Sequence, residues 1–183
     1  SSLASASSTS TSSTAGRPMS RLLQGDVGSG KSAVALVALL AAVGGGAQGA
    51  LMAPTEVLAA QLHKGLETLI SNLEIWGSSS SSSSSSSTSN SPPVFARRPV
   101  VALLTGSTKA AERRAVLQGA ASGTIDVVVG THALSSDAVT FKKLGLAVVD
   151  EQHRFGVLQR SALLAKADPA PHVLSMSATP IPR

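Results

Sequence analysis

The chain has 183 residues, a formal net charge of +5 at pH 7, no cysteine and only 2% aromatic residues. It is long enough for one α/β domain with a hydrophobic core, and the absence of cysteine excludes a disulfide framework and a thiolate metal site. The basic excess is compatible with a polyanionic partner or with a mildly basic soluble domain. The histidines form no metal-binding pair, and the longest apolar run, 33–43, is too short to span a bilayer.

Residues 1–16 consist almost entirely of Ser, Thr and Ala and carry no charge. Such a segment has too little apolar surface to offset the entropy of ordering, so we expect disorder over 1–16 and a folded domain over 17–183. A transit peptide would contain arginines, and Arg17 is the first one here, so a linker is the favoured interpretation. Because the chain begins with Ser rather than Met, we also expect a fragment of a longer protein.

A glycine-rich motif directly follows the first predicted strand, 21–23. Residues 25–32 fit the G-x-x-x-x-G-K-[ST] pattern of phosphate-binding loops. Glycines let successive backbone N–H groups turn toward an anion, Lys31 can neutralise β- and γ-phosphates, and the Ser32 hydroxyl can bind Mg²⁺. The apolar run 32–43 predicts a buried helix whose N-terminus faces the phosphates. We therefore favour nucleotide binding over a structural turn, by Gly25, Asp26, Val27, Gly28, Ser29, Gly30, Lys31 and Ser32.

More strands and helices alternate after the glycines at 44–46, which end the first helix. Leucines at three- and four-residue spacing (58, 62, 66, 69, 73) predict an amphipathic helix from 56 to about 73, with Thr55 as its N-cap. The serine run within 77–93 is interpreted as a low-complexity surface insertion without chemistry. The other predicted strands are 50–53, 100–104, 126–129, 146–149 and 173–176, and the other predicted helices are 109–121 and 157–166.

This alternation predicts an α/β fold with one parallel sheet and helices on both of its faces. Ligands bind such sheets beyond the carboxyl ends of the strands. Every polar motif of the chain falls at such an end, which favours a single functional edge. The motifs are 25–32, 54–56, 105–107, 130–132, 150–151 and 177–179.

Asp150 and Glu151 directly follow the apolar strand 146–149. Asp150 is placed to hold Mg²⁺, which prefers oxygen ligands and keeps several waters, and Glu151 to orient or deprotonate an attacking water. Without a phosphate-binding loop, the pair would be interpreted as a helix cap. With that loop in the same chain, we favour Lys31, Asp150 and Glu151 as catalytic residues and Ser32 and Asp150 as the metal ligands.

Four neighbouring polar residues are candidates for coupling between the γ-phosphate and the last strand. Gln152 and His153 follow the acidic pair, and Ser177 and Thr179 follow the strand 173–176. Small hydroxyl residues suit such a relay because they exchange hydrogen-bond partners readily. A satisfied turn is the alternative interpretation of Ser177 and Thr179.

Several blocks, taken together and in this order, match one known group. Blocks 25–32, 150–157 and 175–183 resemble motifs I, II and III of superfamily 2 helicases, most closely the RecG-type ATP-dependent DNA helicases. Residues 52–56, 103–107 and 130–134 resemble further motifs on the DNA side of that family. The transcription-repair coupling translocases are the nearest alternative, and Ser29 and Gln152 favour the RecG type.

The resemblance implies a RecA-like motor domain that couples Mg-ATP hydrolysis to movement on forked or junction DNA in repair and recombination. It also implies that the hydroxyl residues of the DNA-side motifs lie along a DNA strand and contact its phosphates, which suits a chain with few aromatic residues. Such binding weakens steeply with salt and depends little on base sequence. These residues are Thr55, Thr105, Ser107 and Thr131.

The chain departs from the family's pattern at both ends. Serine-rich sequence stands upstream of Arg17, where the family places an adenine-reading Gln, and the chain stops at Arg183, before a second RecA-like domain with its arginine finger. We therefore expect these residues alone to bind nucleotide weakly, hydrolyse it slowly and not unwind DNA. A truncated nucleotide-binding module and, less favoured, a P-loop kinase are the alternatives.

Overall fold

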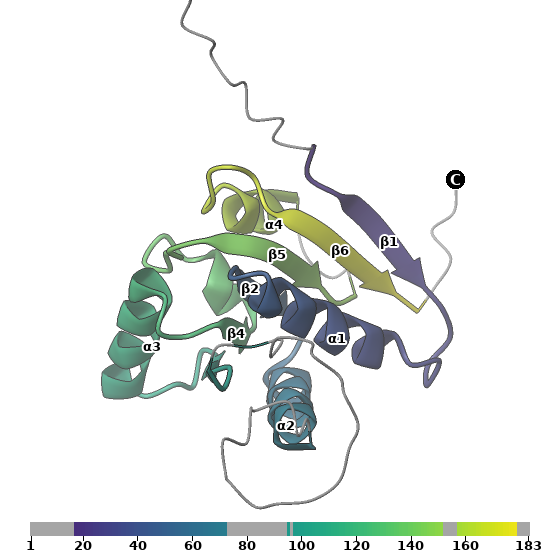
Figure 1. Cartoon of the computed structure of the whole chain (residues 1–183), viewed down its shortest axis with the longest axis horizontal. Helices are drawn as coiled ribbons and strands as arrows, with labels where there is room; N and C mark the ends of the chain where they lie inside the picture. Colours follow the sequence, from purple (N-terminus) through teal and green to yellow (C-terminus); the bar gives the residue numbers. More distant parts are fainter. Residues whose placement is uncertain (1–16, 73–94, 96, 152–156, 179–183) are drawn as a thin grey trace, which may run out of the picture.

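The structure is a computed structural model that describes residues 17–72, 95, 97–151 and 157–178. Within them, six strands form one sheet in which every neighbouring pair is parallel (Figure 1). The order across the sheet is β1-β6-β5-β2-β4-β3. The strands are β1 (Ser20–Gln24), β2 (Gln48–Met52), β3 (Val101–Leu104), β4 (Val127–Gly130), β5 (Leu144–Val149) and β6 (His172–Ser177).

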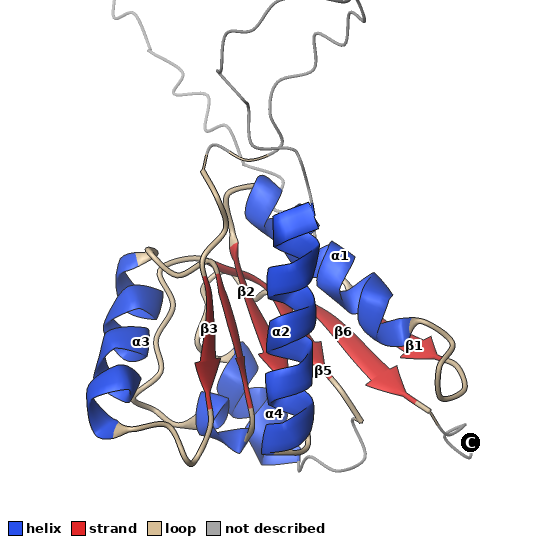
Figure 2. Cartoon of the chain, turned by 90° about the horizontal axis from the view of Figure 1, so that it is seen from below, coloured by secondary structure: helices blue, strands red, loops and turns tan. Residues whose placement is uncertain are grey.

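Helices cover both faces of this sheet. Buried residues of α1 (Lys31–Gly44) and α2 (Glu56–Asn72) share one hydrophobic cluster with one set of strand side chains. Buried residues of α3 (Ala110–Ser122), the 3₁₀ helix η1 (His132–Ser135) and α4 (Val157–Leu164) share a second cluster with the other set. In Figure 2, α1 and α2 accordingly lie in front of the sheet.

The two clusters are separated by the alternation of side chains along each strand. In β4, Val127 and Val129 belong to the α1–α2 side and Val128 to the other side. Every residue of the central strand β2 is buried. Such continuous burial is the pattern of a parallel sheet covered on both faces.

The predicted α/β fold is confirmed, and each predicted strand and helix is present with bounds within two residues of the prediction. The sequence pattern missed η1, which lies between the predicted strands 126–129 and 146–149. A four-residue 3₁₀ helix is too short to show a hydrophobic period. The expected disordered segment 1–16 and the insertion 77–93 lie outside the described residues.

Two expectations about burial need correction. The helix predicted as buried, α1, is buried on one side only, and Val34 and Val37 are 52% and 56% exposed. Apolar composition does not distinguish a helix covered all round from one that lies on a single sheet face. In α2 the fully buried residues are Ala59, Leu62, Leu66 and Ile70, whereas Leu58 and Leu69 of the predicted leucine stripe are only partly buried.

The predicted N-cap of α2 is confirmed. The side-chain Oγ1 of Thr55 accepts a hydrogen bond from the backbone N–H of Leu58 at 3.2 Å. The hydroxyl thereby satisfies one of the N–H groups that the first helical turn leaves without an intrahelical partner.

Candidate functional site

The carboxyl ends of all six strands lie at one edge of the sheet because every pair is parallel. Strand order divides this edge into two halves. The loops after β1, β6 and β5 carry the predicted nucleotide residues and are neighbours. The loops after β2, β4 and β3, which carry the predicted DNA-contacting residues, are neighbours as well.

The glycine-rich loop connects β1 to α1 and needs glycine at two positions. Gly28 and Gly30 have φ of +80° and +86°, in the left-handed region, and Gly30 is the N-cap of α1. No atom lies within 4 Å of a Cβ built at either glycine, so conformation rather than space excludes larger residues there. At Gly25 space is limiting, because a Cβ would lie 2.7 Å from Ser29 Oγ.

The Lys31 ammonium is folded back onto this loop. Its Nζ donates hydrogen bonds to the carbonyl oxygens of Gly25 and Asp26, the latter at 2.6 Å. Ser32, the predicted Mg²⁺ ligand, lies beside it in the first turn of α1 and is exposed. A phosphate would compete well for Lys31, because hydrogen bonds between two charged groups are stronger than those to neutral carbonyls.

Ser177 lies next to the start of the loop. Gln24, the last residue of β1, pairs with Ser177 at the end of β6, and the Gly25 N–H donates to the Ser177 carbonyl at 3.3 Å. Ser177 is 2% exposed. Its predicted coupling role stays a prediction, and the other coupling candidates, Gln152, His153 and Thr179, lie outside the described residues.

The acidic pair lies at the end of β5, on the same edge as the loop. The Asp150 N–H donates to the Met52 carbonyl at 2.9 Å, which joins the pair to the end of β2. Glu151 is the only non-glycine residue with a positive φ among the described residues, at +47°, and its N–H donates to Asp150 Oδ1 at 2.9 Å. Because α4 begins only at Val157, the pair does not cap that helix.

The electrostatic surroundings of Asp150 suit a bound cation. Burial raises the pKa of this carboxyl above its ordinary value, and the Glu151 charge acts in the same direction. The hydrogen bond from Glu151 and the positive charge of Lys31 lower that pKa, so Lys31 and Asp150 lie within electrostatic reach of each other. A bound divalent cation would supply the positive charge that the buried carboxylate lacks.

The donor set also fits Mg²⁺. No cluster of three or more His, Cys, Asp or Glu residues that could hold a metal occurs among the described residues. Mg²⁺ needs no such cluster, because it usually binds through one or two carboxylates, several waters and substrate phosphates. Asp150 and the Ser32 hydroxyl are suitable protein ligands of that kind.

The four predicted DNA-contacting residues do not present their side chains equally. Thr55 and Ser107 are exposed, whereas Thr105 is 4% and Thr131 is 3% exposed. Thr105 Oγ1 shares a hydrogen bond with Ser107 Oγ at 3.0 Å. Only Thr55 and Ser107 therefore offer side-chain hydroxyls at the surface.

Sequence reasoning missed one contact on this half of the edge. Glu56, the first residue of α2, accepts hydrogen bonds from Ser107 Oγ at 2.7 Å and from the Ser107 backbone N–H at 3.2 Å. The hydrogen bond from the Ser107 hydroxyl lowers the pKa of Glu56 most, and the bond from the Ser107 N–H and the charge of His132 lower it further. Desolvation opposes them by raising that pKa. The sequence held one signal for this contact: Glu56 is acidic, although it stands in the motif 54–56, which is expected to face phosphate.

None of the helices in the described ranges combines the length and the apolar content that a bilayer span requires.

The comparisons with known proteins agree with the predicted resemblance. A family model described as DEAD/DEAH box helicase matches residues 9–183. An ATP-dependent DNA helicase RecG from Synechocystis is 51% identical over 166 residues, which cover 91% of this chain and 17% of that protein. One from Streptococcus pneumoniae is 50% identical over 165 residues, covering 90% and 21%.

A solved structure gives the same result in three dimensions. The structure of RecG bound to a three-way DNA junction is 40% identical, has a TM-score of 0.65, and is matched over 90% of this chain and 18% of that one. The chain thus spans about a fifth of the length of these curated relatives. The predicted resemblance to RecG-type proteins is confirmed, and the chain belongs to the DEAD/DEAH box helicase family.

Proposed function

We propose that this chain is the ATP-binding motor domain of a RecG-like DNA translocase, which couples Mg-ATP hydrolysis to movement on forked or junction DNA. The observation that carries the proposal is that the loops after the parallel strands β1 and β5 place Lys31 and Asp150 at the same edge of the sheet. The names of its relatives, which are ATP-dependent DNA helicases, support the same chemistry.

In this proposal each residue of the nucleotide half has a distinct role. The N–H groups of the glycine-rich loop and the Lys31 ammonium bind phosphate oxygens once Lys31 releases the loop carbonyls. Ser32 and Asp150 hold Mg²⁺, which supplies positive charge to the β- and γ-phosphates. Glu151 positions the attacking water, with catalysis resting on placement and charge stabilisation.

The other half of the edge contacts DNA in this proposal. Thr55 and Ser107 offer exposed hydroxyls to a phosphate backbone, and the buried Thr105 supports the loop that carries Ser107 through a hydrogen bond between the two hydroxyls at 3.0 Å. The relative bound to a three-way junction makes branched DNA the substrate class to test first.

Nucleotide binding is tested with the 183-residue chain and a fluorescent ATP analogue. Lys31→Ala should weaken binding at least tenfold, since a charged hydrogen bond to phosphate contributes about 1.5–3 kcal/mol. The matched control is Lys64→Ala, an exposed lysine on α2 that should leave affinity unchanged. Equal affinity of wild type and Lys31→Ala would refute the proposed site.

Hydrolysis is tested in a longer chain that includes a second RecA-like domain. Glu151→Gln should retain bound ATP but lose turnover, whereas Glu67→Gln on α2 should behave as wild type. Normal hydrolysis by Glu151→Gln would show that another group positions the water. If the wild-type protein binds ATP and never cleaves it, the alternative of a binding module without catalysis is the correct one.

A further inference from the structure

The loop 105–108 already binds an anionic group of the same chain, the carboxylate of Glu56. Both the N–H and the hydroxyl of Ser107 donate to the Glu56 carboxylate. A Cβ built at Gly106 would lie 3.1 Å from Glu56 Oε1, so the carboxylate lies directly against the loop backbone. Carboxylate and phosphate oxygens are the same kind of acceptor for such donors.

The loop is ordered by its own hydrogen bonds as well as by Glu56. The Thr105 N–H donates to Thr108 Oγ1 at 2.9 Å, and the Thr108 N–H donates to the Thr105 carbonyl at 3.4 Å. Thr105 Oγ1 lies 3.3 Å from Thr108 Oγ1. These contacts leave the Ser107 donors in place whether or not Glu56 occupies them.

We propose that Glu56 occupies the position of a DNA phosphate at Ser107 and competes with it, so that this carboxylate limits how tightly the edge binds DNA. The inference rests on the proposed function, because it assumes that DNA crosses this half of the edge. The Ser107 hydroxyl has one proton, and it cannot donate to the carboxylate and to a phosphate simultaneously. An anion that stays beside the phosphate also repels it.

The competition predicts a gain of affinity when the charge of Glu56 is removed. Glu56→Gln keeps the size and an acceptor oxygen, so it tests the charge alone. The substitution removes a negative charge at about 4 Å from the phosphate in water and weakens the bond from Ser107 that competes with DNA. DNA binding should therefore tighten about five- to tenfold at low salt. The gain should shrink as salt rises, because exposed charges are screened.

The experiment measures binding of the 183-residue chain to a fluorescein-labelled single-stranded thymidine 20-mer by anisotropy, at one pH because His132 also faces this carboxylate. Glu56→Gln should bind more tightly than wild type. Ser107→Ala, introduced into the Glu56→Gln background, should reverse this gain, because it removes the hydroxyl for which the carboxylate and the phosphate compete. Glu67→Gln, on the same helix, is the control for a general loss of negative charge.

A positioning role for Glu56 would give the opposite result. If Glu56 only held the loop in shape, Glu56→Gln would bind DNA no better than wild type, and that outcome overturns the inference while leaving the nucleotide site untouched. If no variant binds DNA while Lys31-dependent nucleotide binding persists, the DNA half of the proposed function has failed instead.

A second measurement keeps the competition testable without DNA. With ¹⁵N-labelled protein, the Ser107 amide resonance should shift on addition of inorganic phosphate in Glu56→Gln and stay unchanged in wild type at the same concentration. A Ser107 amide that ignores phosphate in Glu56→Gln, or responds equally in both proteins, contradicts the competition.

Discussion

At the scale of single residues, backbone conformation decides which side chains the phosphate-binding loop tolerates. Gly30 caps α1 at a positive φ with open space where a Cβ would be. Gly45, at the other end of the same helix, has an ordinary φ of −78°. The two glycines therefore form a natural pair for comparison.

Gly30→Ala should destabilise the chain by about 1–2 kcal/mol, the cost of a left-handed conformation for a residue with a Cβ. Gly45→Ala should be close to neutral, because its φ suits any residue and its Cβ would make only ordinary van der Waals contacts with backbone oxygens, at 3.4 Å and 3.7 Å. Urea unfolding curves of both variants measure the difference. Equal midpoints would contradict the assignment of strain to position 30.

Asp150, a proposed Mg²⁺ ligand, should carry a cost to stability. Burial raises its pKa, so the charged form is less favourable in the folded chain than in the unfolded one. Asp150→Asn should raise the melting temperature of the nucleotide-free chain by about 2 °C, a small effect because the carboxyl is only partly buried. The same substitution should remove the Mg²⁺ dependence of nucleotide binding.

The sign of the pH dependence follows from the raised pKa. A carboxyl whose folded pKa exceeds the unfolded value destabilises the fold above that pKa, and the cost disappears as the pH falls through it. The difference in melting temperature between Asp150→Asn and wild type should therefore shrink on acidification, as the pH falls through the raised pKa of Asp150. A difference that is constant with pH would assign the effect to packing rather than charge.

At the scale of elements, the fold was more predictable than the contacts between elements. The apolar runs and their glycine and proline boundaries located the strands, because buried parallel strands read as continuous apolar segments. The one-sided burial of α1 could not be predicted, since its composition is apolar on both sides and only the sheet selects a face. The Glu56–Ser107 contact joins residues 51 positions apart, and no local pattern encodes it.

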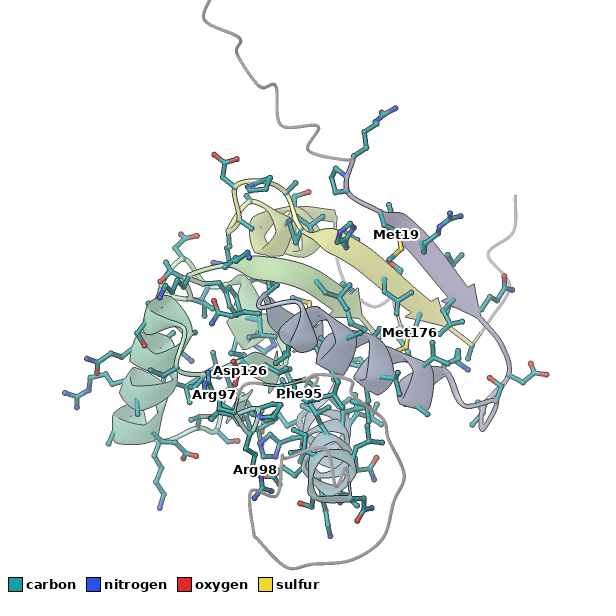
Figure 3. All side chains as sticks on the ribbon, in the orientation of Figure 1. Met19, Phe95, Arg97, Arg98, Asp126 and Met176 are labelled. Atoms are coloured by element: carbon teal, nitrogen blue, oxygen red, sulfur yellow. The ribbon has the colours of Figure 1, made fainter. Side chains whose placement is uncertain are left out.

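The starts of β3 and β4 are held together by a bidentate ion pair that sequence patterns also did not reveal. Both terminal nitrogens of Arg97 lie 2.8 Å from Asp126 oxygens, and Asp126 Oδ2 also accepts the Val100 N–H at 2.7 Å. Figure 3 shows the two side chains together at the amino end of the sheet, opposite the functional edge.

The two partners of this pair should not be equally important. Arg97→Ala should cost at most about 1 kcal/mol, because the Arg97 side chain is 51% exposed. Asp126→Ala should cost about 1–3 kcal/mol, because it removes the acceptor of the Val100 N–H and leaves the guanidinium only its longer bonds to the Arg98 and Gly123 carbonyls, at 3.3 Å and 3.4 Å. Chemical denaturation of both variants and the double variant measures this asymmetry, and a larger loss for Arg97→Ala would contradict it.

At the scale of the whole molecule, the sheet order separates two sets of predicted binding residues on one edge. The predicted nucleotide-binding and catalytic residues follow β1 and β5, the coupling candidate Ser177 ends β6, and the predicted DNA-contacting residues follow β2, β3 and β4. The sequence could predict that all these motifs share an edge, because parallel strands end together. It could not predict the division of that edge, since strand order is set by tertiary packing.

The chain covers about a fifth of the length of its relatives, and by itself it should hydrolyse ATP very slowly. The logarithm of the DNA affinity should fall linearly with the logarithm of the salt concentration. On a single strand, each phosphate contact should add about 0.7 to the steepness of that slope. Robust DNA-stimulated turnover by these 183 residues would contradict this view.

The most direct test of the central claim asks whether Lys31 and Asp150 share one metal-bound nucleotide. Mn²⁺ replaces Mg²⁺ together with a non-hydrolysable ATP analogue, and the paramagnetic broadening of backbone amide resonances is measured across the ¹⁵N-labelled chain. We predict strong broadening at 30–32 and at 150–151 together, little at 97–101 on the opposite edge, and loss of the effect in Asp150→Asn. Broadening at the glycine-rich loop alone, with 150–151 unaffected, would contradict the shared site.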